Sequence, residues 1–345
     1  VMGSGGTPGM VTSSGGGLGS GGVASSGGAT GSGGASGPLI GNLQMLATLN
    51  DIQPLAVGTN GVSVLQYSNA GEALVLYVDW SGKATTWYRT ARSSYGYLGA
   101  SGAQHVALLY TSARYEIALN GDAQDLSGSA TTYKESITAN GRGFAWVNFE
   151  AMGSPPVTSM TGSIVLQDWA GGRIALTDAL RYRSRPQMSD DWLVYVEYAS
   201  IAPGSIGQIQ VQGLTAGAVA KPAAASAHHQ DRPVTDGDWV VWEEYLSSKD
   251  SVIRARNITS GEVRDLSSLV GFRTSPDIKG TRVVWQDERS GGGEIYLNDL
   301  ATTGGERVVV SGKGYSAAPR LTSDGLVWIE SYSGSTGLVK ATWTR

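Results

Sequence analysis

The sequence predicts an all-β protein, a seven-bladed β-propeller of four-stranded blades, carrying a glycine-rich N-terminal extension. Two observations lead to this fold class. Among the 345 residues there are 50 glycines, 10 tryptophans and 15 tyrosines, whereas charged residues make up only 16%. In addition, a unit of about forty residues with short strand-like runs and Gly, Asp or Pro turns recurs along the chain.

The clearest unit covers residues 275–304. Ser275 precedes Pro276, so its backbone is expected to be extended. Residues 282–286 form a β-branched and aromatic run, a glycine-rich turn follows, and residues 294–298 alternate with period two. A two-stranded piece of this kind cannot bury its faces alone, so it needs neighbouring copies.

The copies are counted by an aromatic or apolar anchor in the second strand of each unit. Trp242, Trp285 and Trp328 are spaced by 43 residues each. The repeat anchors are Trp146, Tyr195, Trp242, Trp285 and Trp328, with fainter copies at Leu65 and Ala107. This register gives seven units, and the anchor tryptophans are expected to be core wedges between blades.

The seventh unit ends at Arg345 without an outermost strand. Residues 43–49 resemble such a strand and precede Gln53-Pro54, where the first blade should begin. We therefore predict that Leu43, Met45, Leu46 and Leu49 complete the last blade and close the ring, which removes its exposed edges. The propeller is expected to span residues 39–345.

Residues 1–38 form a tail of Gly, Ser, Ala and Thr without a charged side chain. From Gly16 the glycines follow a three-residue register, at Gly16, Gly19, Gly22, Gly28, Gly31, Gly34 and Gly37. That spacing suits a left-handed helix of three residues per turn, in which glycine lets neighbouring chains approach closely. The tail is either a flexible spacer or a self-associating element.

Three units resemble the bacterial TolB-type propeller repeat. They contain RPVTDGDWVVWEE, SPDIKGTRVVWQDE and APRLTSDGLVWIE, which match the proline, the Asp or Gly turn and the V-V-W-x-D strand of that family. The resemblance is weaker in the first three units. It implies the fold more firmly than any function, because propellers host many unrelated activities.

Composition excludes several classes of partner and site. The net charge of −4 gives no basic surface for nucleic acid, and the absence of Cys removes disulfides and thiolate sites. No apolar run reaches the roughly 18 residues that a membrane-spanning helix needs. Because the chain starts at Val1 and its first fifty residues are uncharged, we expect an exported protein whose signal has been removed, located outside the cell or at its surface.

Acidic residues recur at strand ends, at Asp79, Asp168, Glu243-Glu244 and Asp287-Glu288. Recurrence at a repeat position predicts a structural role, such as accepting turn N–H groups or pairing with Arg. The adjacent His228 and His229 are expected in a solvated loop. The sequence contains no nucleophile elbow, phosphate loop or zinc-protease motif, so no catalytic residue, metal or cofactor is predicted and the protein is not expected to be an enzyme.

Aromatic residues outside the anchor register are candidates for an exposed contact surface. They are Trp80, Trp87, Trp169, Trp192, Trp239, Trp343, Tyr88, Tyr95, Tyr97, Tyr182 and Tyr198. Such a surface would bind a protein or a glycan.

Three functions remain open. The first is a structural subunit of an extracellular filament, in which copies of the chain are linked through the tail by contacts that do not close on themselves. The second is a cell-surface or periplasmic propeller that binds a peptide, a glycan or an envelope partner. The third is a hydrolase or lyase, which would require carboxylates and Arg to converge at one mouth of the central channel.

Overall fold

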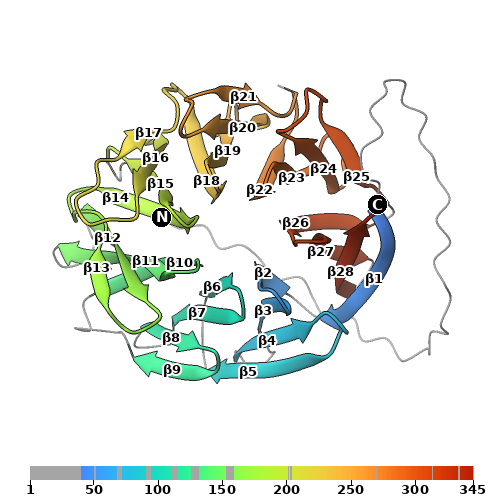
Figure 1. Ribbon diagram of the computed structural model, residues 1–345, viewed down its shortest axis with the longest axis horizontal. Coiled ribbons are helices and arrows are strands. Elements are labelled where there is room, and N and C mark those ends of the chain that lie inside the picture. Colours follow the sequence, from blue (N-terminus) through green and yellow to red (C-terminus); the bar gives the residue numbers. More distant parts are fainter. Residues whose placement is uncertain are drawn as a thin grey trace, which may run out of the picture. The chain divides into compact units, whose positions relative to one another are not determined.

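The computed structural model describes residues 40–344, apart from residues 50–51, 68–71, 91–94, 111–114, 126–131, 153–158, 201, 203, 269, 313 and 333–334. The tail glycines Gly16 to Gly37 lie outside the described residues. The described chain contains 28 strands in seven four-stranded antiparallel sheets, arranged as blades around a centre (Figure 1). No helix long and apolar enough to cross a membrane occurs in this part of the chain. The predicted seven-bladed propeller is confirmed.

Six blades are built from consecutive strands, which follow one another from the innermost to the outermost. Blade 1 contains β2 (Ile52–Val57), β3 (Gly61–Tyr67), β4 (Ala73–Asp79) and β5 (Ala84–Thr90). Blade 2 contains β6 (Tyr95–Ser101), β7 (Gln104–Tyr110), β8 (Tyr115–Leu119) and β9 (Asp122–Asp125). Blade 3 contains β10 (Thr132–Ala139), β11 (Gly143–Met152), β12 (Ser159–Asp168) and β13 (Arg173–Ala175). Blade 4 contains β14 (Tyr182–Met188), β15 (Trp192–Tyr198), β16 (Gly207–Gly213) and β17 (Lys221–Pro222).

The remaining blades carry the strongest repeats. Blade 5 contains β18 (His229–Asp236), β19 (Trp239–Tyr245), β20 (Ser251–Asn257) and β21 (Val263–Asp265). Blade 6 contains β22 (Arg273–Lys279), β23 (Arg282–Asp287), β24 (Glu294–Asp299) and β25 (Arg307–Val310). Blade 7 contains β26 (Tyr315–Leu321), β27 (Gly325–Tyr332), β28 (Ser335–Trp343) and the N-terminal strand β1 (Ile40–Leu49).

The N-terminal strand closes the ring, as predicted. β1 runs antiparallel to β28 along the outer edge of blade 7, with Met45 opposite Val339 (Figure 1). Leu46 is buried in a core shared by blades 1 and 7, and Leu49 packs against the same core. Leu43 and Met45 are exposed, at 64% and 47%. Ile40, on the same strand, packs against the core between blades 6 and 7, so the closing strand contacts both seams of blade 7.

Each anchor lies in the second strand of its blade. Trp242 and Trp285 are fully buried, and Tyr195, Trp328 and Trp146 are almost so. Trp285 packs in a core that joins Val241 and Ile253 of blade 5 to Ile278 of blade 6. The core thus consists of apolar seams between adjacent blades, which explains why one unit cannot fold alone.

The inner strands contain a kink that the sequence did not predict. Ser275 has φ of +57°, so the expectation that it is extended is wrong. Arg185, Arg232 and Ala318 also precede a proline and also have positive φ, and the strand register shifts at each of these positions. These are β-bulges, where a proline is tolerated at the edge of a sheet and one side chain is redirected.

Candidate functional site

The seven inner strands enclose a central channel with a cavity of about 400 Å³. Its charged lining consists of Arg185, Arg232, Arg320, Lys279, Asp236 and Asp277. Arg185 and Arg232 are bulge residues with positive φ, and both residues line the channel. The channel is therefore polar, in contrast to the apolar seams around it.

Two carboxylates and an arginine come together on the inner strands β10, β14 and β18; of the three residues, only Arg185 lines the channel cavity. The Nε of Arg185, on β14, lies 2.8 Å from Oδ1 of Asp231, on β18. Glu135, on β10, interacts electrostatically with both residues. Burial raises the pKa of Glu135; Arg185 opposes this rise, and Asp231 adds to it. Two carboxylates in different surroundings thus share one arginine.

A second arginine belongs to the blade junction. Nη1 of Arg232 lies 3.4 Å from Oε1 of Glu243, which is fully buried. Glu243 also accepts hydrogen bonds from the Tyr245 hydroxyl at 2.7 Å and from the backbone N–H of Ser275 in the next blade at 2.6 Å. Burial raises the pKa of Glu243, and these donors counteract the rise. This carboxylate joins blades 5 and 6 and is structural.

Aromatic rings surround the end of the channel where the inner strands begin. They form a continuous series of ring contacts from blade 2 to blade 6, with centroid distances of 4.9 to 6.1 Å. We call this series the aromatic collar; it consists of Tyr110, Tyr115, Tyr133, Phe149, Tyr182, Tyr198, His229, Tyr245 and Phe272. Three of its rings, Tyr133, Tyr182 and His229, lie at the start of an inner strand. They precede Glu135, Arg185 and Asp231, respectively, by two or three residues.

The collar is partly open to solvent. Phe149 is fully buried and supports the series, whereas Tyr133 is 37% exposed and Tyr182, Tyr198 and His229 are half-buried. Burial raises the pKa of Tyr182 to about 12, with a further contribution from the charge of Glu135. Burial also raises the pKa of Tyr198, with a contribution from Asp231. Tyr182 and Tyr198 therefore stay protonated and combine an apolar ring with a hydrogen-bonding hydroxyl.

Other recurrent acids satisfy donors within their own blade. Glu244, Asp287 and Glu330 each accept the indole N–H of the anchor tryptophan two residues earlier, at 3.3, 3.4 and 2.8 Å. Residues i and i+2 of a strand share one face, which makes this contact possible. The structural interpretation of Glu244 and Asp287 agrees with these contacts.

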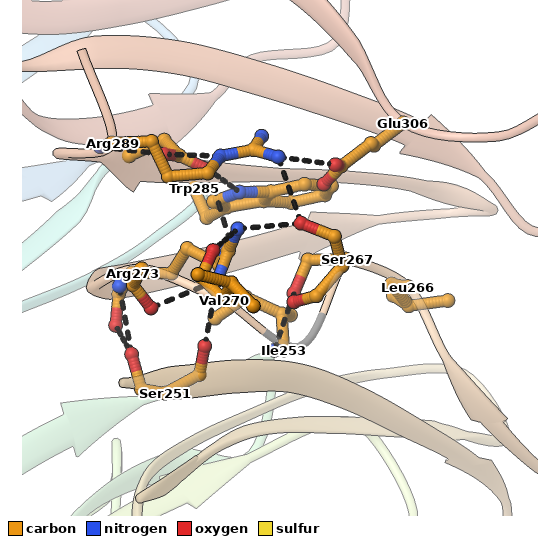
Figure 2. A network of polar contacts seen from close by, with 12 residues as sticks. Ser251, Ile253, Leu266, Ser267, Val270, Arg273, Trp285, Arg289 and Glu306 are labelled. Carbon is orange, nitrogen blue, oxygen red and sulfur yellow. Dashed lines mark hydrogen bonds and ion pairs between the residues drawn. The ribbon is translucent and has the colours of Figure 1, made fainter. Parts of the chain in front are cut away.

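Figure 2 shows how residues of blades 5 and 6 together enclose the ion pair formed by Arg273. Arg273 is fully buried, and its Nε donates to Oδ2 of Asp287 at 3.1 Å. Its four remaining N–H groups are used by carbonyl oxygens of Ser251, Val270 and Gly271 and by the hydroxyl of Ser268. No donor remains for a ligand.

Asp79 and Asp168 hold turns. Oδ1 of Asp79 accepts the backbone N–H groups of Ser81 and Lys83, and Oδ1 of Asp168 accepts those of Ala170 and Gly172. Accepting two turn N–H groups is a structural task.

The histidines have three different surroundings. His228 is exposed, as a solvated loop requires. His229, expected in the same loop, instead begins β18, stacks between Tyr198 and Tyr245, and accepts the N–H of Gly207 at 2.9 Å. His105 is buried between blades 1 and 2. In the described ranges, no three His, Cys, Asp or Glu side chains come together in a way that could hold a metal ion.

The tryptophans outside the anchor register are half-buried and do not form one exposed patch. Several cover blade junctions: Lys340 of blade 7 lies over the ring of Trp80, and Arg282 of blade 6 lies over Trp343, at 4.4 and 4.9 Å. Of the tyrosines in that expectation, Tyr182 and Tyr198 belong to the collar and Tyr97 lines the channel. None of these tryptophans is exposed, and Tyr182 and Tyr198 are half-buried as well, so a contact surface built from them stays a prediction.

Sequence reasoning missed Glu135, Arg185 and Asp231. They lie 46 to 96 residues apart and only the ring brings them together. One signal was available: Tyr133, Tyr182 and His229 recur at or next to the first position of successive inner strands, in the same way that the anchors recur in the second strands.

The fold relates this chain to known proteins, and TolB, whose repeat the last three units resemble, is among them. No protein-family model matches the sequence, and no curated protein matches it. The chain is similar in structure to oligogalacturonate lyase from Vibrio parahaemolyticus, with a TM-score of 0.63, 9% identity, and coverage of 87% of this chain and 93% of that one. It is similar to TolB from Acinetobacter baumannii, with a TM-score of 0.51, 13% identity, and coverage of 76% and 66%.

It is also similar to acylaminoacyl peptidase from Pyrococcus horikoshii, with a TM-score of 0.63, 12% identity, and coverage of 85% of this chain and 51% of that one. These likenesses correct the expectation that the protein is not an enzyme, because propellers of this architecture occur in a lyase and in peptidases. The absence of short motifs was the wrong criterion. In a ring, each blade contributes separate side chains to the centre, so a site need not appear as a contiguous motif.

Proposed function

We propose that the channel mouth inside the aromatic collar binds a carbohydrate chain. The observation that carries the proposal is the position of the partly exposed rings beside the Arg185–Asp231 pair and Glu135. Aromatic faces provide apolar area for the C–H faces of sugar rings, and arginine and carboxylates provide donors and acceptors for hydroxyl groups. An apolar wall with a few convergent polar groups is typical of a small-molecule site.

A chemical step on the bound chain, hydrolysis or elimination, is the second candidate. It is favoured by the raised pKa of Glu135 next to Asp231 and Arg185. Acid–base catalysis commonly uses a group whose pKa is shifted by burial and by neighbouring charges. A carbohydrate substrate is also consistent with the activity of oligogalacturonate lyase, whose fold is similar.

Isothermal titration of the full chain with oligosaccharides of galacturonate, cellulose and chitin tests the binding site. Tyr198→Ala and Arg185→Ala should each weaken binding of the recognised chain about tenfold or more. Tyr332→Ala is the matched control, because Tyr332 is a 48% exposed tyrosine at the end of a second strand in blade 7, outside the collar. If none of these oligosaccharides binds, or if both site variants bind as tightly as the wild type, the proposal is contradicted.

A turnover assay separates the two candidates. If the protein cleaves the chain it binds, new chain ends should accumulate with time, and Glu135→Gln should abolish their release while changing the binding constant by less than about threefold. If the wild type binds without releasing chain ends, the site is a binding site only.

Filament formation through residues 1–38 concerns residues outside the described part of the chain and stays a prediction, as does export from the cytoplasm. Electron microscopy of the full chain and of a variant lacking residues 1–38 tests the assembly. Filaments formed by both proteins would contradict a linking role of the tail.

A further inference from the structure

A second pocket lies between blades 1 and 2, at the opposite ends of the inner strands from the collar. It has a volume of about 380 Å³. Its wall combines the rings of Tyr77, Trp87 and His105 with the polar side chains of Asn60, Thr85 and Asn120. We call it the outer pocket. None of its residues belongs to the collar or lines the central channel.

The inner wall of the outer pocket is held in place by buried contacts. Oγ of Ser63, which is fully buried, lies 2.8 Å from Nδ1 of His105. The Tyr77 ring meets the His105 ring edge-on, with centroids 5.1 Å apart and an interplanar angle of 72°. Gly58 leaves the space that the ring requires, since a Cβ there would lie 2.6 Å from its Nε2. The aromatic wall is therefore preorganised.

The turn from β8 to β9 is locked to the same histidine. The backbone N–H of His105 donates to Oδ1 of Asn120 at 2.8 Å, and the N–H of Asn120 donates back to the carbonyl of His105 at 3.0 Å. Asn120 holds a positive φ of 49° in this turn. These reciprocal bonds fix the floor of the pocket relative to its wall.

No side chain of the pocket wall is charged at neutral pH. Burial lowers the pKa of His105, so its ring is neutral. Burial raises the pKa of Tyr77, and the charge of Asp79 adds to the rise, so the phenol stays protonated. An ionised ligand would lose water without gaining a counter-charge, which disfavours anions and cations.

The rim offers solvent-exposed polar groups beside the rings. Asn60 and Thr85 are exposed, and within the described chain neither side chain makes a hydrogen bond. A ligand that suits this wall has an apolar face for Trp87 and Tyr77 and hydroxyl groups for the amide and hydroxyl of the rim. The volume is near the lower end of the range of about 300–1,000 Å³ that small-molecule sites occupy.

We infer that the outer pocket is a binding site for one neutral sugar ring, separate from the site in the channel. A hexose has an apolar C–H face, peripheral hydroxyl groups and no charge, which matches the wall, the rim and the electrostatics. Because the aromatic wall and the floor are fixed before binding, little ordering is required of the protein.

Titration of the full chain with the methyl glycosides of glucose, galactose, mannose and N-acetylglucosamine, followed by saturation-transfer NMR and calorimetry, tests this inference. At least one glycoside should bind with a Kd of roughly 10 mM or below, since a single ring buries little area. Trp87→Ala should weaken that binding about tenfold, and Asn60→Ala about threefold. Trp192→Ala, which removes another half-buried tryptophan, should leave it unchanged.

Thermal unfolding of each variant shows whether weaker binding reflects loss of the site or loss of the fold. If Trp87→Ala does not fold, Asn60→Ala, at an exposed position of the rim, still tests the site. Glycoside binding that persists in both Trp87→Ala and Asn60→Ala would overturn the inference. So would the absence of binding by all four glycosides. Loss of binding in Tyr198→Ala with retention in Trp87→Ala would place the sugar in the collar and overturn it as well, whereas failure of the collar proposal would leave this result unaffected.

Discussion

In blades 5, 6 and 7 the anchor tryptophan donates its indole N–H to a carboxylate two residues later, whereas in blade 3 the buried indole nitrogen of Trp146 has no hydrogen-bond partner among the described residues. Asn148 takes the place of the carboxylate there. Blades 1 and 2 replace the tryptophan itself, with Leu65 and Ala107. The last three blades therefore share an internal polar lock that the first three lack.

The residues of the polar lock have a structural role, and they differ from the residues of the candidate sites. The carboxylates of the lock are buried, and their oxygens already accept hydrogen bonds from within the protein. Their role is therefore to stabilise the blade. The outer pocket lies between blades 1 and 2, and Glu135 belongs to blade 3. The channel site draws on both halves of the ring, since Asp231 belongs to blade 5, so only the outer pocket is confined to blades with a weak repeat.

Arg273→Ala should give the largest loss of stability. It removes one of the two arginines that pair with the buried carboxylate of Asp287, so that only Arg289 remains, and it leaves several buried acceptors without a donor. This should cost about 3–5 kcal/mol in the free energy of unfolding. Chemical denaturation measures it. The control is Arg89→Ala in blade 1, where an exposed pair with Glu72 at 3.7 Å should contribute less than about 1 kcal/mol. If the two variants lose similar amounts of unfolding free energy, the buried ion pair of blade 6 does not stabilise the ring more than the exposed pair of blade 1.

Leu46→Ala tests the seam at which the first and last blades meet. Leu46 is 5% exposed in the core that joins blades 1 and 7, so its truncation should cost about 2–5 kcal/mol. Leu43, on the same strand, is 64% exposed, and Leu43→Ala should change stability by less than about 0.5 kcal/mol. Denaturation of both variants should therefore distinguish the two faces of β1; equal effects would mean that this strand does not anchor the ring.

Trp328→Phe and Trp146→Phe measure the polar lock directly. Both residues are nearly buried, but only Trp328 donates to a carboxylate, Glu330, at 2.8 Å. Losing a hydrogen bond to a charged acceptor should make the Trp328 variant less stable than the Trp146 variant by about 1–3 kcal/mol. If the two substitutions cost the same free energy, the carboxylate does not stabilise the anchor.

The smallest effect is a pH dependence in the first blades. Because the pKa of His105 is lowered by burial, the unfolded chain binds a proton at this residue more readily than the folded protein does. The free energy of unfolding should therefore fall as the pH is lowered below the unfolded pKa of about 6.5, by at most about 1.4 kcal/mol per pH unit. His105→Gln should remove this part of the pH dependence, and the exposed His228→Gln should not. An unchanged slope in His105→Gln would refute the assignment.

Much of the fold could be predicted because its signals are local. The regular spacing of the anchors and the lack of an outer strand after residues 338–343 can be seen in the sequence, and they led to the seven blades and to closure by residues 43–49. The conformation of Ser275 was not predictable in this way. The preference of a residue before proline for extended backbone is weak, and the bulge in the inner strand overrides it.

The candidate sites were less predictable. His229 was expected in a solvated loop because its neighbours are small, yet the start of β18 places it between two tyrosine rings of different blades. Arg185 was not singled out at all, because its partner Asp231 lies 46 residues away, one blade further on.

The sequence by itself determined the repeat, the number of blades and the strand that closes them, because each blade is encoded by contiguous residues whose alternation and turns are visible in order. Only the tertiary structure decided which polar and aromatic side chains meet. The ring places corresponding positions of separate blades around one axis, so the collar, the Arg185–Asp231 pair and the outer pocket arise from residues that no local pattern connects.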